Sequence, residues 1–137
     1  MDEKEKKAQE AYMQFQMLEQ QIKQLQGQFE MVTQQLMELS ATNNSLDDFQ
    51  KIGLSGEAFI PLSSGIFAKA SIRDTSELLV NVGANVVVKK DIASTKKLIQ
   101  SQIEEIKKIQ KQMSDELEKA INHAAQLEMH MQKLMPQ

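Results

Sequence analysis

Two long segments of the chain share one pattern, in which apolar residues recur at alternating steps of three and four. In the first segment, from about Lys4 to Leu46, the residues between these positions are mainly Gln, Glu and Lys. The recurring positions are Ala8, Ala11, Phe15, Leu18, Ile22, Leu25, Phe29, Val32, Leu36, Leu39, Asn43 and Leu46. Because this spacing averages about 3.5 residues per turn, it predicts a helix of a left-handed coiled coil. Gly27 is its one weak point, at a cost of about 1 kcal/mol relative to Ala.

The second segment, from about Ile92 to Leu134, repeats the pattern with two polar interruptions, Lys96 and Gln110. Its recurring positions are Ile92, Lys96, Ile99, Ile103, Ile106, Gln110, Met113, Leu117, Ala120, Ala124, Leu127, Met131 and Leu134. Either Asp91 or Ser94 can serve as the N-cap, and Pro136 marks the end. The pattern therefore predicts a second coiled-coil helix.

The two predicted helices have matching lengths of roughly 60–70 Å at 1.5 Å per residue. Two equal helices joined by an insert fold back on each other most simply as an antiparallel pair. One register places Leu18 opposite Ala124 and Ile22 opposite Ala120, whereas a rival register places Ala11 opposite Ala124. We prefer the first register because a large residue against a small one fills the space between helices better.

The segment between the helices, about 53–90, loses the helical period and contains four short runs typical of strands. These runs are Phe59–Leu62, Ile66–Ile72, Glu77–Val82 and Val86–Lys90, and turn residues such as 63–65, 73–76 and 83–85 separate them. Pro61 cannot donate to a strand ladder, so we expect it at an edge or a strand start. The prediction is a mainly α protein of one domain, residues 1–137. It has a coiled-coil helix over 4–50, two β-hairpins for assembly over 53–90, and a second helix over 91–135.

The predicted hairpins are too small to bury their own apolar residues, because four short strands can neither close a barrel nor cover a sheet face. The residues concerned are Ile60, Ile66, Phe67, Leu79, Val80, Val82, Val86 and Val88. Each contributes roughly 1.5–3 kcal/mol when fully buried, and open strand edges favour pairing. We therefore expect an oligomer assembled through these strands. The alternative is that helices of the same chain cover the hairpins.

Composition narrows the possible functions. The chain has 137 residues, 4% aromatic residues, a net charge of -3 and no cysteine. The low aromatic content fits a narrow helical seam, and the absence of a basic excess argues against nucleic acid as a partner. Without cysteine there are no disulfides and no thiol chemistry, which fits a cytoplasmic protein. We expect neither a signal peptide nor a membrane span, because no apolar segment is long enough.

No catalytic arrangement is evident, so we expect no enzyme activity, no cofactor and no metal. His123 and His130 are seven residues apart, whereas pairs of zinc ligands on a helix prefer a spacing of four. The many carboxylates alternate with lysines, as in solvated helix faces.

Methionine is the unusual feature of the composition, with nine residues in the chain. Met1, Met13 and Met17 lie towards one terminus and Met129, Met131 and Met135 towards the other, so an antiparallel pair brings them to one tip. Met13, Met129 and Met135 fall outside the recurring positions, which leaves them at least partly exposed. Methionine adapts to varied apolar partners, which suggests a soft patch for apolar segments. Frayed ends with ordinary flanking residues are the alternative.

The insert also carries motifs that resemble one known family. The segments 59–62 (FIPL), 65–70 (GIFAKA), 73–75 (RDT) and 79–84 (LVNVGA), between heptads, are similar to those of prefoldin alpha subunits. The likeness covers the whole chain, and room for two hairpins matches the alpha rather than the beta type. The chain differs from the family at Asn85, where Gly is common, and at Ser63 and Ser64. Asn tolerates a left-handed backbone, so the last turn should survive.

This resemblance implies an ATP-independent chaperone subunit. Two alpha subunits and four beta subunits would form a hexamer whose hairpins build a double β-barrel body. Its coiled-coil tips would hold unfolded polypeptides for a group II chaperonin in the cytosol. The substrate-contacting residues would be Met13, Phe15, Met17, Met129, Met131, Leu134 and Met135, with Phe15 and Met131 contributing if the end of the coil splays. A structural scaffold or tether without affinity for unfolded chains is the alternative function.

Overall fold

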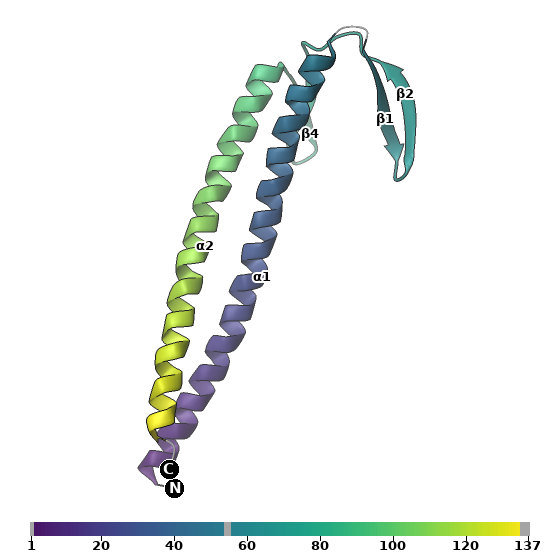
Figure 1. The fold of residues 1–137 in the computed structure, drawn as a ribbon. Helices are drawn as coiled ribbons and strands as arrows, with labels where there is room; N and C mark the ends of the chain where they lie inside the picture. The colour runs from purple at the N-terminus through teal and green to yellow at the C-terminus, as the bar shows by residue number, and fades with distance from the viewer. Residues whose placement is uncertain (1, 54–55, 135–137) are drawn as a thin grey trace. The chain divides into compact units, whose positions relative to one another are not determined.

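The computed structural model describes residues 2–53 and 56–134 and consists of two long helices separated by two β-hairpins (Figure 1). Helix α1 spans Glu3–Ile52 and helix α2 spans Ile92–Leu134. Strands β1 (Glu57–Ser63) and β2 (Ile66–Ser71) form one hairpin, and β3 (Leu78–Gly83) and β4 (Val86–Lys90) form the other. The predicted fold class is confirmed, and the predicted elements differ from the observed ones by a few terminal residues.

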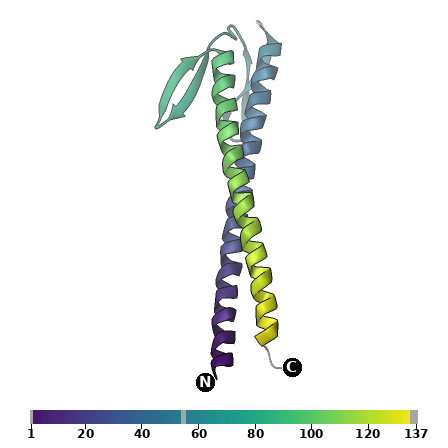
Figure 2. The same ribbon diagram turned by 90° about the vertical axis from the view of Figure 1, so that its left-hand side faces the viewer.

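The chain divides into two units. The distal unit contains the described residues of 1–35 and 106–137, and the proximal unit contains 36–105. In the distal unit the N-terminal part of α1 and the C-terminal part of α2 run antiparallel, with both termini at the same end (Figures 1 and 2). Gln110 Nε2 donates a hydrogen bond to Thr33 Oγ1 at 2.9 Å between these two helices.

The core of the distal unit is a narrow seam made of the predicted recurring residues. Ala11, Ala120 and Ala124 are buried, and larger members such as Leu18 and Leu117 are half-buried. Among the described residues no large side chain is completely buried. Two helices therefore bury a stripe rather than a compact core, as expected for a coiled coil.

In the proximal unit, Ile92, Ile99 and Ile103 of α2 are buried. An ion pair links Lys96 of α2 to Asp47 of α1. Asn43, the one polar residue predicted in the α1 seam, has a buried side-chain oxygen that lacks a hydrogen-bond partner within the described residues.

The start of α2 settles which residue caps it. The carboxylate of Asp91 accepts a hydrogen bond from the Ser94 backbone N–H at 2.7 Å, so Asp91 rather than Ser94 is the N-cap. This bond and its side-chain counterpart from Ser94 lower the pKa of Asp91 below its usual value. At the other helix end, Gly53 follows α1 with a φ of 68°, the left-handed conformation that commonly ends helices.

Both hairpins have two-residue turns preceded by a bulge. In the first hairpin, Pro61 pairs with Phe67 and Ser63 with Ile66, which leaves Leu62 as the extra residue. In the second, Asn81 pairs with Val87 and Gly83 with Val86, which leaves Val82 unpaired. Each hairpin forms its own two-stranded sheet, so Pro61 lies within an edge strand as predicted.

Candidate chaperone tip and assembly surface

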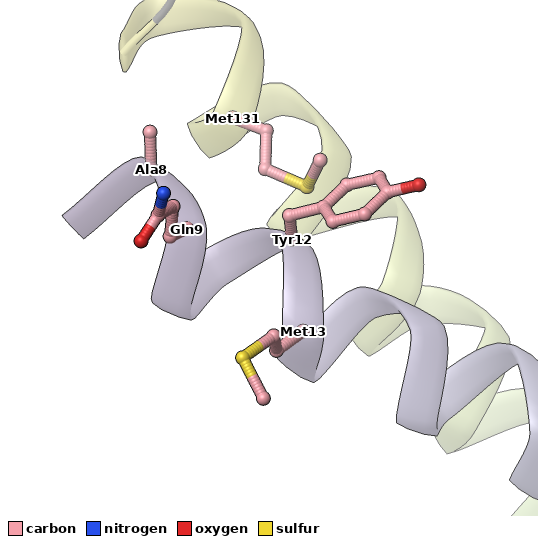
Figure 3. Close-up of a pocket in the computed structure, with 5 residues that line it drawn as sticks. All are labelled: Ala8, Gln9, Tyr12, Met13 and Met131. Carbon is pink, nitrogen blue, oxygen red and sulfur yellow. The ribbon is translucent and has the colours of Figure 1, made fainter. Parts of the chain in front are cut away.

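The distal unit brings residues from both chain ends around one hollow of about 400 Å³. Its lining residues are Ala8, Gln9, Tyr12, Met13 and Met131. Ala8 and Ala11 are small members of the seam, and the space they leave is consistent with a hollow beside Met131. Figure 3 shows the Met131 side chain extending towards the Tyr12 ring, whereas Met13 extends away from α2. Methionine beside an aromatic ring is a favourable and adaptable contact.

The predicted tip residues divide into exposed and half-buried groups. Met13, Met17 and Met129 are exposed by 63%, 69% and 62%. Phe15, Met131 and Leu134 are half-buried members of the seam, and Met135 lies outside the described residues. The exposure expected for Met13 and Met129 is therefore confirmed, while contact with a substrate stays a prediction for all seven residues.

Sequence reasoning missed Tyr12 and Gln9 at this tip. Tyr12 is half exposed and accepts a hydrogen bond from Gln16 Nε2 at 3.1 Å, which holds the ring against the helix surface. The sequence does contain a signal for Tyr12 at the tip. The chain's one tyrosine directly follows Ala11, a small member of the seam, so its large ring lies beside a position where the seam is thin.

The hairpins expose most of the apolar residues predicted for assembly. Ile60, Ile66, Phe67, Leu79, Val82 and Val86 are exposed, while Val80 and Val88 are half-buried. Phe59, Leu62 and Val87 are exposed as well and were missed by the sequence reasoning. Phe59 pairs with Lys69, which forms an exposed ion pair with Glu57 at 3.2 Å, so this face mixes apolar and charged groups.

The described residues contain neither a group of candidate metal ligands nor a membrane-spanning helix. Within residues 2–53 and 56–134, no three His, Asp or Glu side chains are grouped as metal ligands. The same residues include no helix that is long and apolar enough to cross a bilayer.

Comparison with known proteins then decides the family. The sequence model of the family described as prefoldin subunit matches residues 18–137. The chain belongs to the prefoldin family. This match confirms the resemblance seen in the insert. The prefoldin family is a family of chaperones.

The curated relatives are prefoldin alpha subunits of archaea. The one from Methanocorpusculum labreanum is 30% identical over 132 residues, covering 95% of this chain and 84% of the relative. The one from Archaeoglobus fulgidus is 26% identical over 124 residues, covering 90% of each chain. These matches extend over most of the chain, which supports its assignment to the archaeal alpha type.

A solved structure supports the fold. The cryo-EM structure of filamentous PFD from Methanocaldococcus jannaschii has a TM-score of 0.74 with this chain and 14% sequence identity. The match covers 82% of this chain and 93% of the other. At this identity the likeness establishes a shared prefoldin fold.

Proposed function

We propose that the chain is an alpha subunit of a cytosolic prefoldin heterohexamer, two alpha with four beta subunits. The complex captures unfolded polypeptides at its coiled-coil tips and delivers them to a group II chaperonin without using ATP. The exposed apolar residues of both hairpins support assembly with other subunits, because a lone hairpin gains little from its own contacts. In the assembly, we expect strands of neighbouring subunits to cover them.

One observation carries the capture step: Met13, Met17 and Met129 are exposed on the distal unit, and Met13 lines the same hollow as Tyr12 and Met131. Exposed methionines can repack against many apolar sequences, as a binder of diverse unfolded chains requires. The half-buried Phe15, Met131 and Leu134 add apolar area if the tip splays on binding, and we place Met135 in the same substrate-binding set.

The test uses the methionines themselves. In the hexamer assembled with beta subunits, Met13→Gln, Met17→Gln and Met129→Gln together should weaken suppression of aggregation of a chemically unfolded protein, measured by light scattering. A matched control is Met31→Gln with Met37→Gln, because these residues are exposed by 72% and 66% but lie away from the hollow. The control should behave as the parent.

Two outcomes would contradict the proposal. Suppression unchanged in the tip variant would remove the tip as the capture site, and no suppression by the parent hexamer would favour a scaffold or tether. Delivery has a separate readout, because a labelled polypeptide held by the hexamer should move to added group II chaperonin on a native gel. Retention on the hexamer would refute the delivery step.

A further inference from the structure

Sulfur in this chain occurs only in methionine, and much of it is exposed. The sequence has nine methionines and no cysteine. Among the described residues, the methionines with exposed fractions of 62% to 72% are Met13, Met17, Met31, Met37 and Met129. Met113 and Met131 belong to the seam and are half-buried. An exposed thioether is open to oxidation, whereas a half-buried one is reached less readily.

The exposed methionines form two groups by position. Met13, Met17 and Met129 belong to the helix ends that form the tip (Figure 1). Met31 and Met37 lie farther along α1, and Met31 is about 21 Å from Met17 along the helix axis at 1.5 Å per residue. Because all five side chains are similarly exposed, a small oxidant can reach both groups, and only position distinguishes them.

Oxidation changes what a methionine side chain can bind. Hydrogen peroxide transfers one oxygen atom to the sulfur: the O–O bond breaks, an S–O bond forms, the sulfur loses two electrons to the peroxide, and water is released. The sulfoxide that results is polar, so an apolar segment that covers it must displace its bound water. A surface that holds apolar segments through Met13, Met17 and Met129 should therefore lose affinity for them when these residues are oxidised.

We propose that Met13, Met17 and Met129 are modification sites, at which oxidation by peroxide reversibly prevents the binding of unfolded chains. This inference rests on the proposed function. The change is reversible because methionine sulfoxide reductases return the sulfoxide to the thioether. Met131 is a half-buried seam residue whose side chain extends towards the Tyr12 ring (Figure 3), so it should be oxidised later. The coiled coil should therefore stay intact while the exposed sulfurs react.

Peroxide treatment of the assembled hexamer tests the inference. The hexamer is incubated with dilute hydrogen peroxide, catalase then removes the peroxide, and peptide mass spectrometry locates the sulfoxides. Binding of dye-labelled, reduced and carbamidomethylated α-lactalbumin is then measured by fluorescence anisotropy. We expect sulfoxide at positions 13, 17 and 129 before position 131, and a roughly tenfold lower affinity for this probe. Methionine sulfoxide reductases for both sulfoxide epimers, supplied with dithiothreitol, should restore the affinity.

Leucine substitution separates the tip methionines from all others in the hexamer. Leu is apolar, close to Met in volume and inert to dilute peroxide, so it keeps the apolar contact and removes the reaction. With Met13→Leu, Met17→Leu and Met129→Leu together, peroxide should change the affinity by less than about twofold. The matched control, Met31→Leu with Met37→Leu, removes similarly exposed sulfurs away from the tip and should lose affinity as the parent does. Each variant is compared with itself before peroxide.

Three outcomes would overturn the inference and leave capture itself intact. They are sulfoxide at the three tip positions without loss of affinity, oxidation of position 131 before these positions, and an equal loss of affinity in the tip variant and the parent. A loss accompanied by a lower mass in light scattering would also overturn it, because the hexamer would then have dissociated. An affinity that the reductases do not restore would refute reversibility. An untreated parent that does not bind the probe would overturn the proposed function, and the inference with it.

Discussion

Gln110 of α2 donates a hydrogen bond to Thr33 of α1, and this pair reports the register of the distal coiled coil. The preferred register places Thr33 opposite Ile109, which is the residue next to its observed partner Gln110. The rival register places Thr33 opposite Gln102, eight residues from Gln110. In the proximal unit the ion pair of Asp47 with Lys96 falls in the same register. The register predicted from large-against-small packing is therefore confirmed in both units. The two polar interruptions of the α2 seam each meet a polar partner on α1.

This hydrogen bond should contribute measurably to stability. We expect a double-mutant cycle of Thr33→Val and Gln110→Leu to give a coupling free energy of about 0.5–1.5 kcal/mol in chemical unfolding. The Gln110→Leu variant alone extends the apolar seam and so offsets part of its own loss. Additive single substitutions would show that the bond contributes nothing.

Gly27 weakens α1 without a steric reason. A Cβ atom added there would meet nothing within 4 Å, so no neighbour prevents substitution. Gly27→Ala should raise the free energy of unfolding by about 1 kcal/mol through helix propensity alone. Calorimetry of the assembled complex and of the variant checks this, and an unchanged or lower melting temperature would contradict it.

Ala84 is a strained residue in the second hairpin. The turn residues Ala84 and Asn85 have φ values of 50° and 62°, and Asn tolerates this region better than Ala does. Ala84→Gly should therefore stabilise the hairpin by about 1 kcal/mol. Gly83 provides a control with the opposite expected effect. Its φ of 113° favours glycine, so Gly83→Ala should destabilise the hairpin. Thermal unfolding that ranks the two variants the other way would refute the turn geometry.

The Asp91 cap should make stability fall in acid. Hydrogen bonds from Ser94 lower the pKa of Asp91 in the folded chain below 3.8, so the cap stabilises above that pH. Its contribution is lost as pH falls through the folded pKa. Asp91→Ala should lower the melting temperature at pH 7, and the difference from the parent should shrink below pH 3.8. Asp91→Asn keeps a capping acceptor and should retain most of the stability at pH 7. A parent–Ala difference that is independent of pH would contradict this mechanism.

The hairpin surface should decide assembly. Leu79 and Asn81 lie on the same face of β3, two residues apart, and both are exposed in the single chain. Leu79→Asp places a charge where a neighbouring subunit is expected, and it should prevent formation of the hexamer with beta subunits. Asn81→Asp adds the same charge but keeps the acceptor for the Gly83 N–H, so it should still assemble. Light scattering gives the masses, and a hexamer of normal mass from the Leu79 variant would refute the interface.

The helices could be predicted closely because their signal is periodic and local. Each seam residue from Ala8 to Leu46 and from Ile92 to Leu134 is buried or half-buried in the structure. The two hairpins could be predicted from turn residues such as Gly65 and Gly83. Both glycines have the positive φ values that these turns require. The tip was predicted in part, since Met13 and Met129 are exposed as expected but Tyr12 was missed.

The sequence by itself determined the two helices, the two hairpins and the prefoldin resemblance, because heptad spacing and turn chemistry depend on neighbours in the chain. The tertiary structure decided which residues face each other across the seam, as with Thr33 and Gln110. It also decided that Asp91 caps α2 and that Tyr12 of α1 and Met131 of α2 line one hollow. These features depend on the rotation and stagger of one helix against another, and many staggers satisfy the same heptad pattern until side chains pack.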